Sequence, residues 1–180
     1  VSLLYRGHAY TRADIEAEVD DLVLRLLRVS VRRGEHVGVL TESGAALLST
    51  TAALSRIGAV AVLLRPGSDT RAELQLSRTR RILVDAAGLP GLAGIEDVTV
   101  NLIGDAHGID LPAGVENLSM IDTTSVRPPN WYRPNPGRGR DLAFILFGDG
   151  SDGVRAVPVT NRRWALSAYG AASAASLTES

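Results

Sequence analysis

Residues 142–161 read LAFILFGDGSDGVRAVPVTN, an apolar run that ends in three glycines spaced around serine and aspartate. The apolar run predicts a buried β-strand, and the residues after the glycines predict a second extended segment. Glycine lets backbone N–H groups approach an anion closely, and many nucleotide-binding folds hold phosphate in such a turn. We therefore expect any chemistry of this chain at this turn.

Known glycine motifs fit the turn to different degrees. Gly148, Gly150 and Gly153 satisfy the G-x-G-x-x-G spacing of dinucleotide-binding folds. That fingerprint needs a helix directly after the glycines, whereas residues 154–160 are rich in β-branched side chains and contain Pro158. A Walker loop is excluded because it needs a lysine and the chain has none. A plain tight turn between two strands remains the alternative to a phosphate site.

The same stretch resembles the phosphate-loop motif of adenylate-forming enzymes, the superfamily of acyl-CoA synthetases, luciferases and peptide-synthetase adenylation domains. In that motif an apolar strand precedes (S/T)-(S/T)-G-(S/T)-(S/T)-G-x-P-K-G-V-x-x-T-H. With one deletion, seven residues fall on its G, S, G, K, G, V and T positions: Gly150, Ser151, Gly153, Arg155, Ala156, Val157 and Thr160.

The resemblance continues upstream in two further motifs. Residues 9–11 (AYT) before an amphipathic helix, and then residues 33–40 (RGEHVGVL), are similar to the family's x-Y-T-x-x-E-L … R-x-G-D-x-V-A-V-L opening. Residues 54–63 (LSRIGAVAVL) are similar to its L-x-A-G-A-V-x-V-P-L helix-to-strand step. The three motifs occur in the family's order, and together they cover much of residues 5–65 and 141–165.

The resemblance implies the amino-terminal portion of an AMP-forming acyl-CoA synthetase, most like a fatty acyl-CoA synthetase. Such enzymes join a carboxylate to the α-phosphate of ATP, release pyrophosphate, and pass the acyl group to a thiol such as coenzyme A. The implied cofactors are ATP or AMP with Mg, and coenzyme A is a co-substrate in the full-length context only. The implied partners are a small carboxylic or fatty acid and the remainder of a larger ligase chain. The fragment alone is expected to be inactive, because the family's acyl tunnel and catalytic lysine cannot be mapped onto it.

For the turn, the resemblance implies cofactor binding, and no catalytic or metal-binding residue is assigned. The family loop holds the β- and γ-phosphates through backbone N–H groups and hydroxyls, and its lysine stabilises the leaving group. Arg155 keeps that charge, but Gly148, Asp149 and Asp152 stand where the family has hydroxyls, so two carboxylates would meet a polyanion. The loop is therefore degenerate, and the alternative function is a non-catalytic scaffold or interaction domain that has lost ATP binding. The candidate cofactor-binding residues are Gly148, Asp149, Gly150, Ser151, Asp152, Gly153, Arg155 and Thr160.

Apolar strands and amphipathic helices alternate along the rest of the chain. This alternation predicts an α/β fold with a mostly parallel sheet and flanking helices, which the resemblance identifies with the N-terminal subdomain of an adenylate-forming ligase. Strands are expected at 36–40, 59–64, 81–85 and 98–103, and helices at 12–28, 43–57, 71–79 and 161–177.

We divide the chain into three segments by composition. Residues 1–124 form an α/β unit, residues 125–140 a connector rich in proline, glycine and arginine, and residues 141–180 a strand, a phosphate-type loop and the start of a further, incomplete unit.

Composition limits the remaining function classes. An apolar content of 45% and a net charge of −1 describe an ordinary globular domain with no bias toward nucleic acid or membranes. Cysteine is absent, which excludes disulfides and thiolate metal sites and favours a cytoplasmic location. No apolar run approaches the roughly 20 residues that span a bilayer, so no transmembrane segment is expected.

Overall fold

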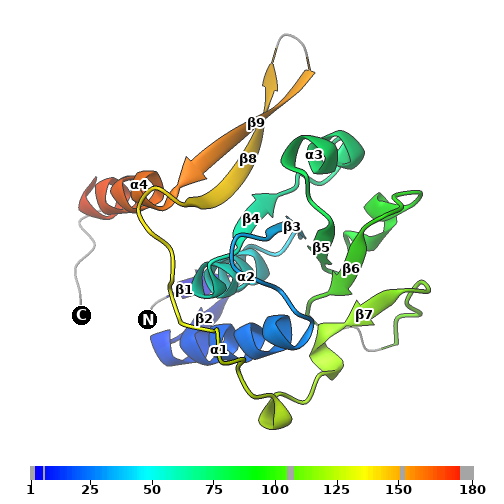
Figure 1. The fold of residues 1–180 in the computed structure, drawn as a ribbon, viewed down its shortest axis with the longest axis horizontal. Helices are drawn as coiled ribbons and strands as arrows, with labels where there is room; N and C mark the ends of the chain where they lie inside the picture. Colours follow the sequence, from blue (N-terminus) through cyan, green and yellow to red (C-terminus); the bar gives the residue numbers. More distant parts are fainter. Residues whose placement is uncertain (1–2, 6, 105–107, 151–152, 175–180) are drawn as a thin grey trace.

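The computed structural model describes residues 3–5, 7–104, 108–150 and 153–174. Its main feature is a seven-stranded sheet in the order β7-β6-β5-β3-β4-β8-β9 (Figure 1). Neighbouring strands from β7 to β8 pair in parallel, whereas β8 and β9 pair antiparallel. The predicted α/β fold with a mostly parallel sheet is therefore confirmed. The strands are β3 (His36–Leu40), β4 (Val60–Leu63), β5 (Arg81–Val84), β6 (Thr99–Leu102), β7 (Val115–Asn117), β8 (Leu142–Gly150) and β9 (Gly153–Thr160).

Apolar side chains cover both faces of the central strands, because successive residues of a strand point to opposite sides. In β4, Ala61 joins the core beneath helices α1 (Arg12–Arg28) and α2 (Gly44–Ile57), which pack against each other. Val60 and Val62 join a second core on the opposite face, to which helix α3 (Thr70–Ser77) contributes Leu74. The flanking helices therefore lie on both sides of the sheet.

Short elements complete the chain. A separate antiparallel pair precedes α1, and three single turns of 3-10 helix follow β5 and β7. The pair is β1 (Leu3–Tyr5) with β2 (His8–Tyr10), and the turns are η1 (Leu89–Leu92), η2 (Leu118–Met120) and η3 (Thr123–Ser125).

The ends of α1 and α2 lie within one residue of their predicted positions, whereas α3 ends two residues before its predicted end at 79. The predicted end of the last helix at 177 lies outside the described residues. The Thr11 hydroxyl accepts from the Asp14 backbone N–H, and an Asp14 carboxylate oxygen accepts from the Thr11 N–H, so the two residues form a capping box for α1. Ser43 caps α2, which ends at Gly58 with φ of 81°. Helix α4 (Asn161–Ala174) begins directly after β9, as expected, and its Trp164 ring contacts that of Phe144 at 4.7 Å between centroids.

Residues 126–141 run without helix or strand from η3 to β8. Tyr132 packs against the core beneath α1 and α2, and the Asn135 N–H donates to the carbonyl of Arg56 near the end of α2. Asp141 accepts from the Arg138 backbone N–H and pairs with Arg33, which together lower the pKa of its carboxyl. The segment thus lies on the α/β unit, and its role as a connector between two units stays a prediction.

Among the described residues, no helix combines the length and apolarity that crossing a bilayer requires.

Gly58 gives a direct test of this packing. A Cβ there would lie 2.5 Å from Cγ of Pro136, and the residue has φ of 81°. Gly67 has a similar φ of 76° but open space around it, so it is a matched control. We expect Gly67→Ala to lower the free energy of unfolding by about 1 kcal/mol, and Gly58→Ala by at least about 2 kcal/mol, because the second substitution adds a clash to the backbone strain. Urea denaturation measures both, and equal losses would contradict the contact with Pro136.

Candidate functional site

The glycine-rich turn joins β8 to β9 at the edge of the sheet. The two strands pair from Leu142 opposite Thr160 to Gly150 opposite Gly153, which makes a β-hairpin closed by two residues. Those two, the predicted site residues Ser151 and Asp152, lie outside the described residues. Figure 1 shows that the far half of the hairpin projects beyond the ends of the neighbouring parallel strands, beside α3.

Local geometry favours glycine at two of the three positions. Gly153 has φ of 110°, a conformation that other residues rarely adopt. A Cβ on Gly150 would lie 3.2 Å from the carbonyl oxygen of Gly153, closer than side chains normally approach. Gly148 has open space around its Cα, so nothing in the described structure requires a glycine there.

The hairpin gathers five of the eight predicted site residues at its tip and places one elsewhere. Gly148 lies opposite Arg155, and the pairing continues to Gly150 and Gly153, so these residues and Asp149 occupy one end. Thr160 lies opposite Leu142, seven residues away along β9, which corresponds to about 24 Å of extended chain. Its hydroxyl accepts from the backbone N–H of Arg163 and so caps the first turn of α4. The structure therefore does not bring Thr160 to the turn.

The two charged residues at the tip have different surroundings. Arg155 is exposed and has no hydrogen-bond or ion-pair partner among the described residues. The Asp149 carboxylate is 85% exposed but accepts from Nη1 of Arg65 at 2.9 Å. Its negative charge is therefore partly compensated before any ligand approaches.

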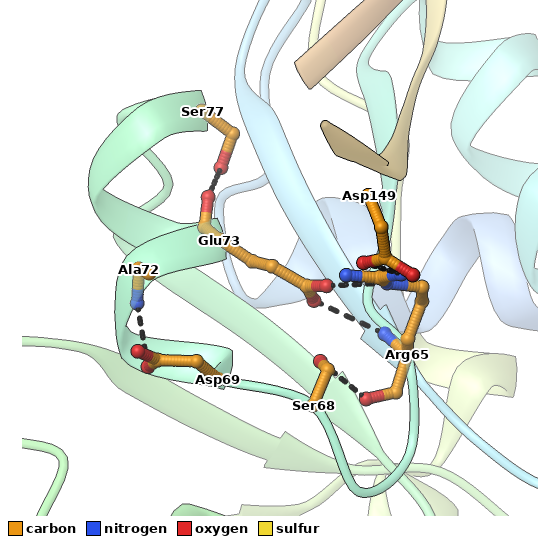
Figure 2. A network of polar contacts seen from close by, with 7 residues as sticks. All are labelled: Arg65, Ser68, Asp69, Ala72, Glu73, Ser77 and Asp149. Carbon is orange, nitrogen blue, oxygen red and sulfur yellow. Dashed lines mark hydrogen bonds and ion pairs between the residues drawn. The ribbon is translucent and has the colours of Figure 1, made fainter. Parts of the chain in front are cut away.

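Arg65 belongs to a network that joins three elements (Figure 2). Its Nε donates to one carboxylate oxygen of Glu73 at 2.8 Å, and its backbone N–H donates to the other at 3.1 Å. Glu73 lies in α3 and is fully buried, whereas Arg65 follows β4 and Asp149 lies in β8. The hydrogen bond to Glu73, followed by the one to Asp149, raises the pKa of the Arg65 guanidinium.

The loop between β4 and α3 holds this network in place. Gly67 turns the chain with φ of 76°, and the Ser68 hydroxyl donates to the carbonyl of Arg65 at 2.8 Å. Asp69 then caps α3 by accepting from the Ala72 N–H at 3.0 Å, and the helix starts three residues before Glu73. Arg65 was not among the predicted site residues, because an arginine before a proline carries no local signal of this role.

A small hollow of about 230 Å³ lies beside the same loop, at the carboxyl ends of β3 and β4. Its walls include Leu40, Thr41, Pro66 and Ser68. Helices α2 and α3 leave these adjacent strands toward opposite faces of the sheet, and in open α/β sheets ligands bind in the crevice at such a switch point. The loop that carries Arg65 therefore borders both this crevice and the glycine turn. A larger hollow of about 700 Å³, between β3, β4, β8 and α4, contains none of the predicted site residues.

The described tip residues suit a phosphate group better than a metal ion. They combine glycine backbone with the exposed cation of Arg155, and the one carboxylate among them is paired with Arg65. Within the part of the chain that the structure describes, no three histidine, aspartate or glutamate side chains come close enough to hold a metal ion.

Comparisons with known proteins agree with this architecture. No family model matches the chain. The fold is similar to that of an acyl-CoA synthetase from Brucella canis, with a TM-score of 0.72 and 23% identity over 89% of this chain and 29% of that one. It is similar to a putative long-chain-fatty-acid CoA ligase from Rhodopseudomonas palustris, with a TM-score of 0.75 and 18% identity over 97% of this chain and 44% of that one. It is also similar to the anthranilate CoA ligase AuaEII in complex with anthranoyl-AMP, with a TM-score of 0.72 and 20% identity over 91% and 32%.

One curated protein, the fusarin C synthetase of Gibberella moniliformis, is 25% identical over 158 residues, which are 87% of this chain and 4% of that protein. The chain thus spans less than half the length of every one of these relatives. The solved neighbours are AMP-binding, adenylate-forming ligases, and the matching parts are the amino-terminal subdomain. This chain has the fold of the N-terminal subdomain of adenylate-forming ligases.

Proposed function

We propose that this chain is the part of an AMP-forming acid:CoA ligase that binds the phosphates of ATP. The observation that carries the proposal is the glycine hairpin at the edge of a mostly parallel sheet, where Arg155 lies opposite Gly148 and has no ion-pair partner among the described residues. Backbone N–H groups near Gly150 and Gly153 and the guanidinium of Arg155 would bind the triphosphate. ATP supplies the adenylyl group that activates a carboxylate, and the acyl group then passes to a thiol such as coenzyme A.

The proposed substrate class is a small carboxylic acid, with a fatty acid as the more specific candidate. The names of the structural neighbours support the class, since they include both acyl and aromatic acid ligases. We further propose that the remainder of a larger ligase chain supplies the acid site, and that the whole works in the cytoplasm. Mg²⁺ would be held mainly by the phosphates and water, because it keeps several waters and rarely needs an all-protein cage.

A second candidate is a scaffold that keeps the fold and has lost ATP binding. The exposed carboxylate of Asp149 favours it, since a negative charge beside a polyanion weakens binding. Its ion pair with Arg65 argues in the other direction. The two candidates differ in one measurable property, the affinity for Mg·ATP.

Arg155 provides the test. We expect Arg155→Gln to weaken Mg·ATP binding about tenfold, a loss of about 1.4 kcal/mol, because it removes a charge-assisted contact to phosphate. Isothermal titration calorimetry of the wild type and the variant measures this loss. Arg12→Gln is a matched control, since it removes an exposed arginine that pairs with Glu16 on α1. A wild-type protein that does not bind Mg·ATP at millimolar concentration would favour the scaffold.

A second test concerns completeness. The 180-residue chain by itself should give no acid-dependent exchange of pyrophosphate into ATP, because it spans only a minor part of the ligases that it resembles. The assay is isotope exchange with labelled pyrophosphate and a panel of fatty and aromatic acids, against a heat-inactivated sample. Acid-dependent exchange above that background would mean that the chain carries a complete active site.

A further inference from the structure

The outer half of the hairpin has little support from the sheet. Strand β8 pairs with β4 only at Phe144 and Ile145, so from Leu146 to Gly150 its one strand partner among the described residues is β9. An isolated two-stranded ribbon is marginally stable in water. Phe147 and Ala156 pack against the core near α3 and support the middle of this ribbon. Its tip therefore depends on another contact.

An ion pair between Asp149 and Arg65 provides such a contact at the tip. Asp149 is one residue from the end of β8, and Arg65 lies in the loop after β4. Figure 2 shows the guanidinium lying between the carboxylates of Asp149 and Glu73. The pair thus links the free end of the hairpin to the body of the fold.

Glu73 determines where the Arg65 side chain lies. A fully buried carboxylate is costly unless it is paired and hydrogen-bonded, and both oxygens of Glu73 accept from Arg65. These two bonds use the backbone N–H and Nε of Arg65 as donors. Nη1 then donates to Asp149. The planar guanidinium can bond both carboxylates at once, which a lysine ammonium at this position would do less well.

We propose that Arg65 is a positioning residue for the candidate phosphate turn. Held by Glu73, it fixes the tip of the hairpin through Asp149 and offsets the negative charge that Asp149 would present to a phosphate. Asp149 is then a structural anchor of the turn. The statement about phosphate rests on the proposed function, whereas the statement about the tip does not.

Amide hydrogen exchange tests the positioning role without any ligand. In Asp149→Asn the pair of Arg65 with Glu73 stays intact, so we expect exchange at Gly148 and Gly150 to become about two- to fivefold faster, the range for loss of one exposed ion pair. Exchange at Val62, in the centre of the sheet, should not change. Glu16→Gln is the matched control, because it breaks an exposed ion pair on α1. Tip exchange equal to that of the wild type, or a similar increase at Val62, would overturn the proposal.

The variant Arg65→Lys distinguishes a positioning role of Arg65 from an effect of its charge alone. It keeps a positive charge but loses the planar fork, so positioning predicts faster tip exchange and about fivefold weaker Mg·ATP binding in calorimetry. A pure charge effect predicts wild-type values for both, and that result would also overturn the proposal. If the wild type itself does not bind Mg·ATP, the proposed function fails, and the exchange of Asp149→Asn and Arg65→Lys alone decides the positioning role.

Discussion

A parallel strand with helices on both sides is shielded from water on both faces. This constraint determines the apolar composition of the central strands and the sides on which the helices pack. Strands β3, β4 and β5 send alternate side chains into two separate cores, so the crossovers between them must cover both faces. Helix α2 therefore packs on one side and α3 on the other. The carboxyl ends of β3 and β4 are left between diverging helices, and the loop with Arg65 lies at this point.

Strand β8 belongs to two environments along its length. Its first half adds to the parallel sheet beside β4, where Phe144 and Ile145 are buried. Its second half leaves the sheet and pairs only with β9 in the described structure. A turn that binds a ligand must be exposed to solvent. An exposed turn has few packing contacts, so packing alone does not fix its position. Ion pairs hold the turn in place of buried apolar contacts. The fully buried Glu73 binds Arg65, and Arg65 binds the exposed Asp149.

Strands that are buried on both faces have continuous apolar sequences, and the sequence predicts these strands well. Residues 59–64 (AVAVLL) are such a run, and β4 occupies Val60–Leu63 within it. The shorter predicted strand at His36–Leu40 also has its predicted bounds. The strands β1, β2 and β7 have three residues each, too short to show any period, and were not predicted. At the candidate site the glycine hairpin was predictable, because its local geometry favours glycine at Gly150 and Gly153. The pair of Arg65 with Asp149 joins positions 84 apart, so it depends on tertiary structure that no local pattern encodes.

Strand β9 lies at the edge of the sheet, with β8 as its one strand neighbour in the described structure. An open strand edge is a template for pairing with another chain, and proteins counter this with proline and charge. Pro158 removes one backbone donor from β9, and Arg155 places an exposed charge on it. The proline that argues against a helix after the glycines thus also makes the longest free edge among the described strands a poor starting point for aggregation.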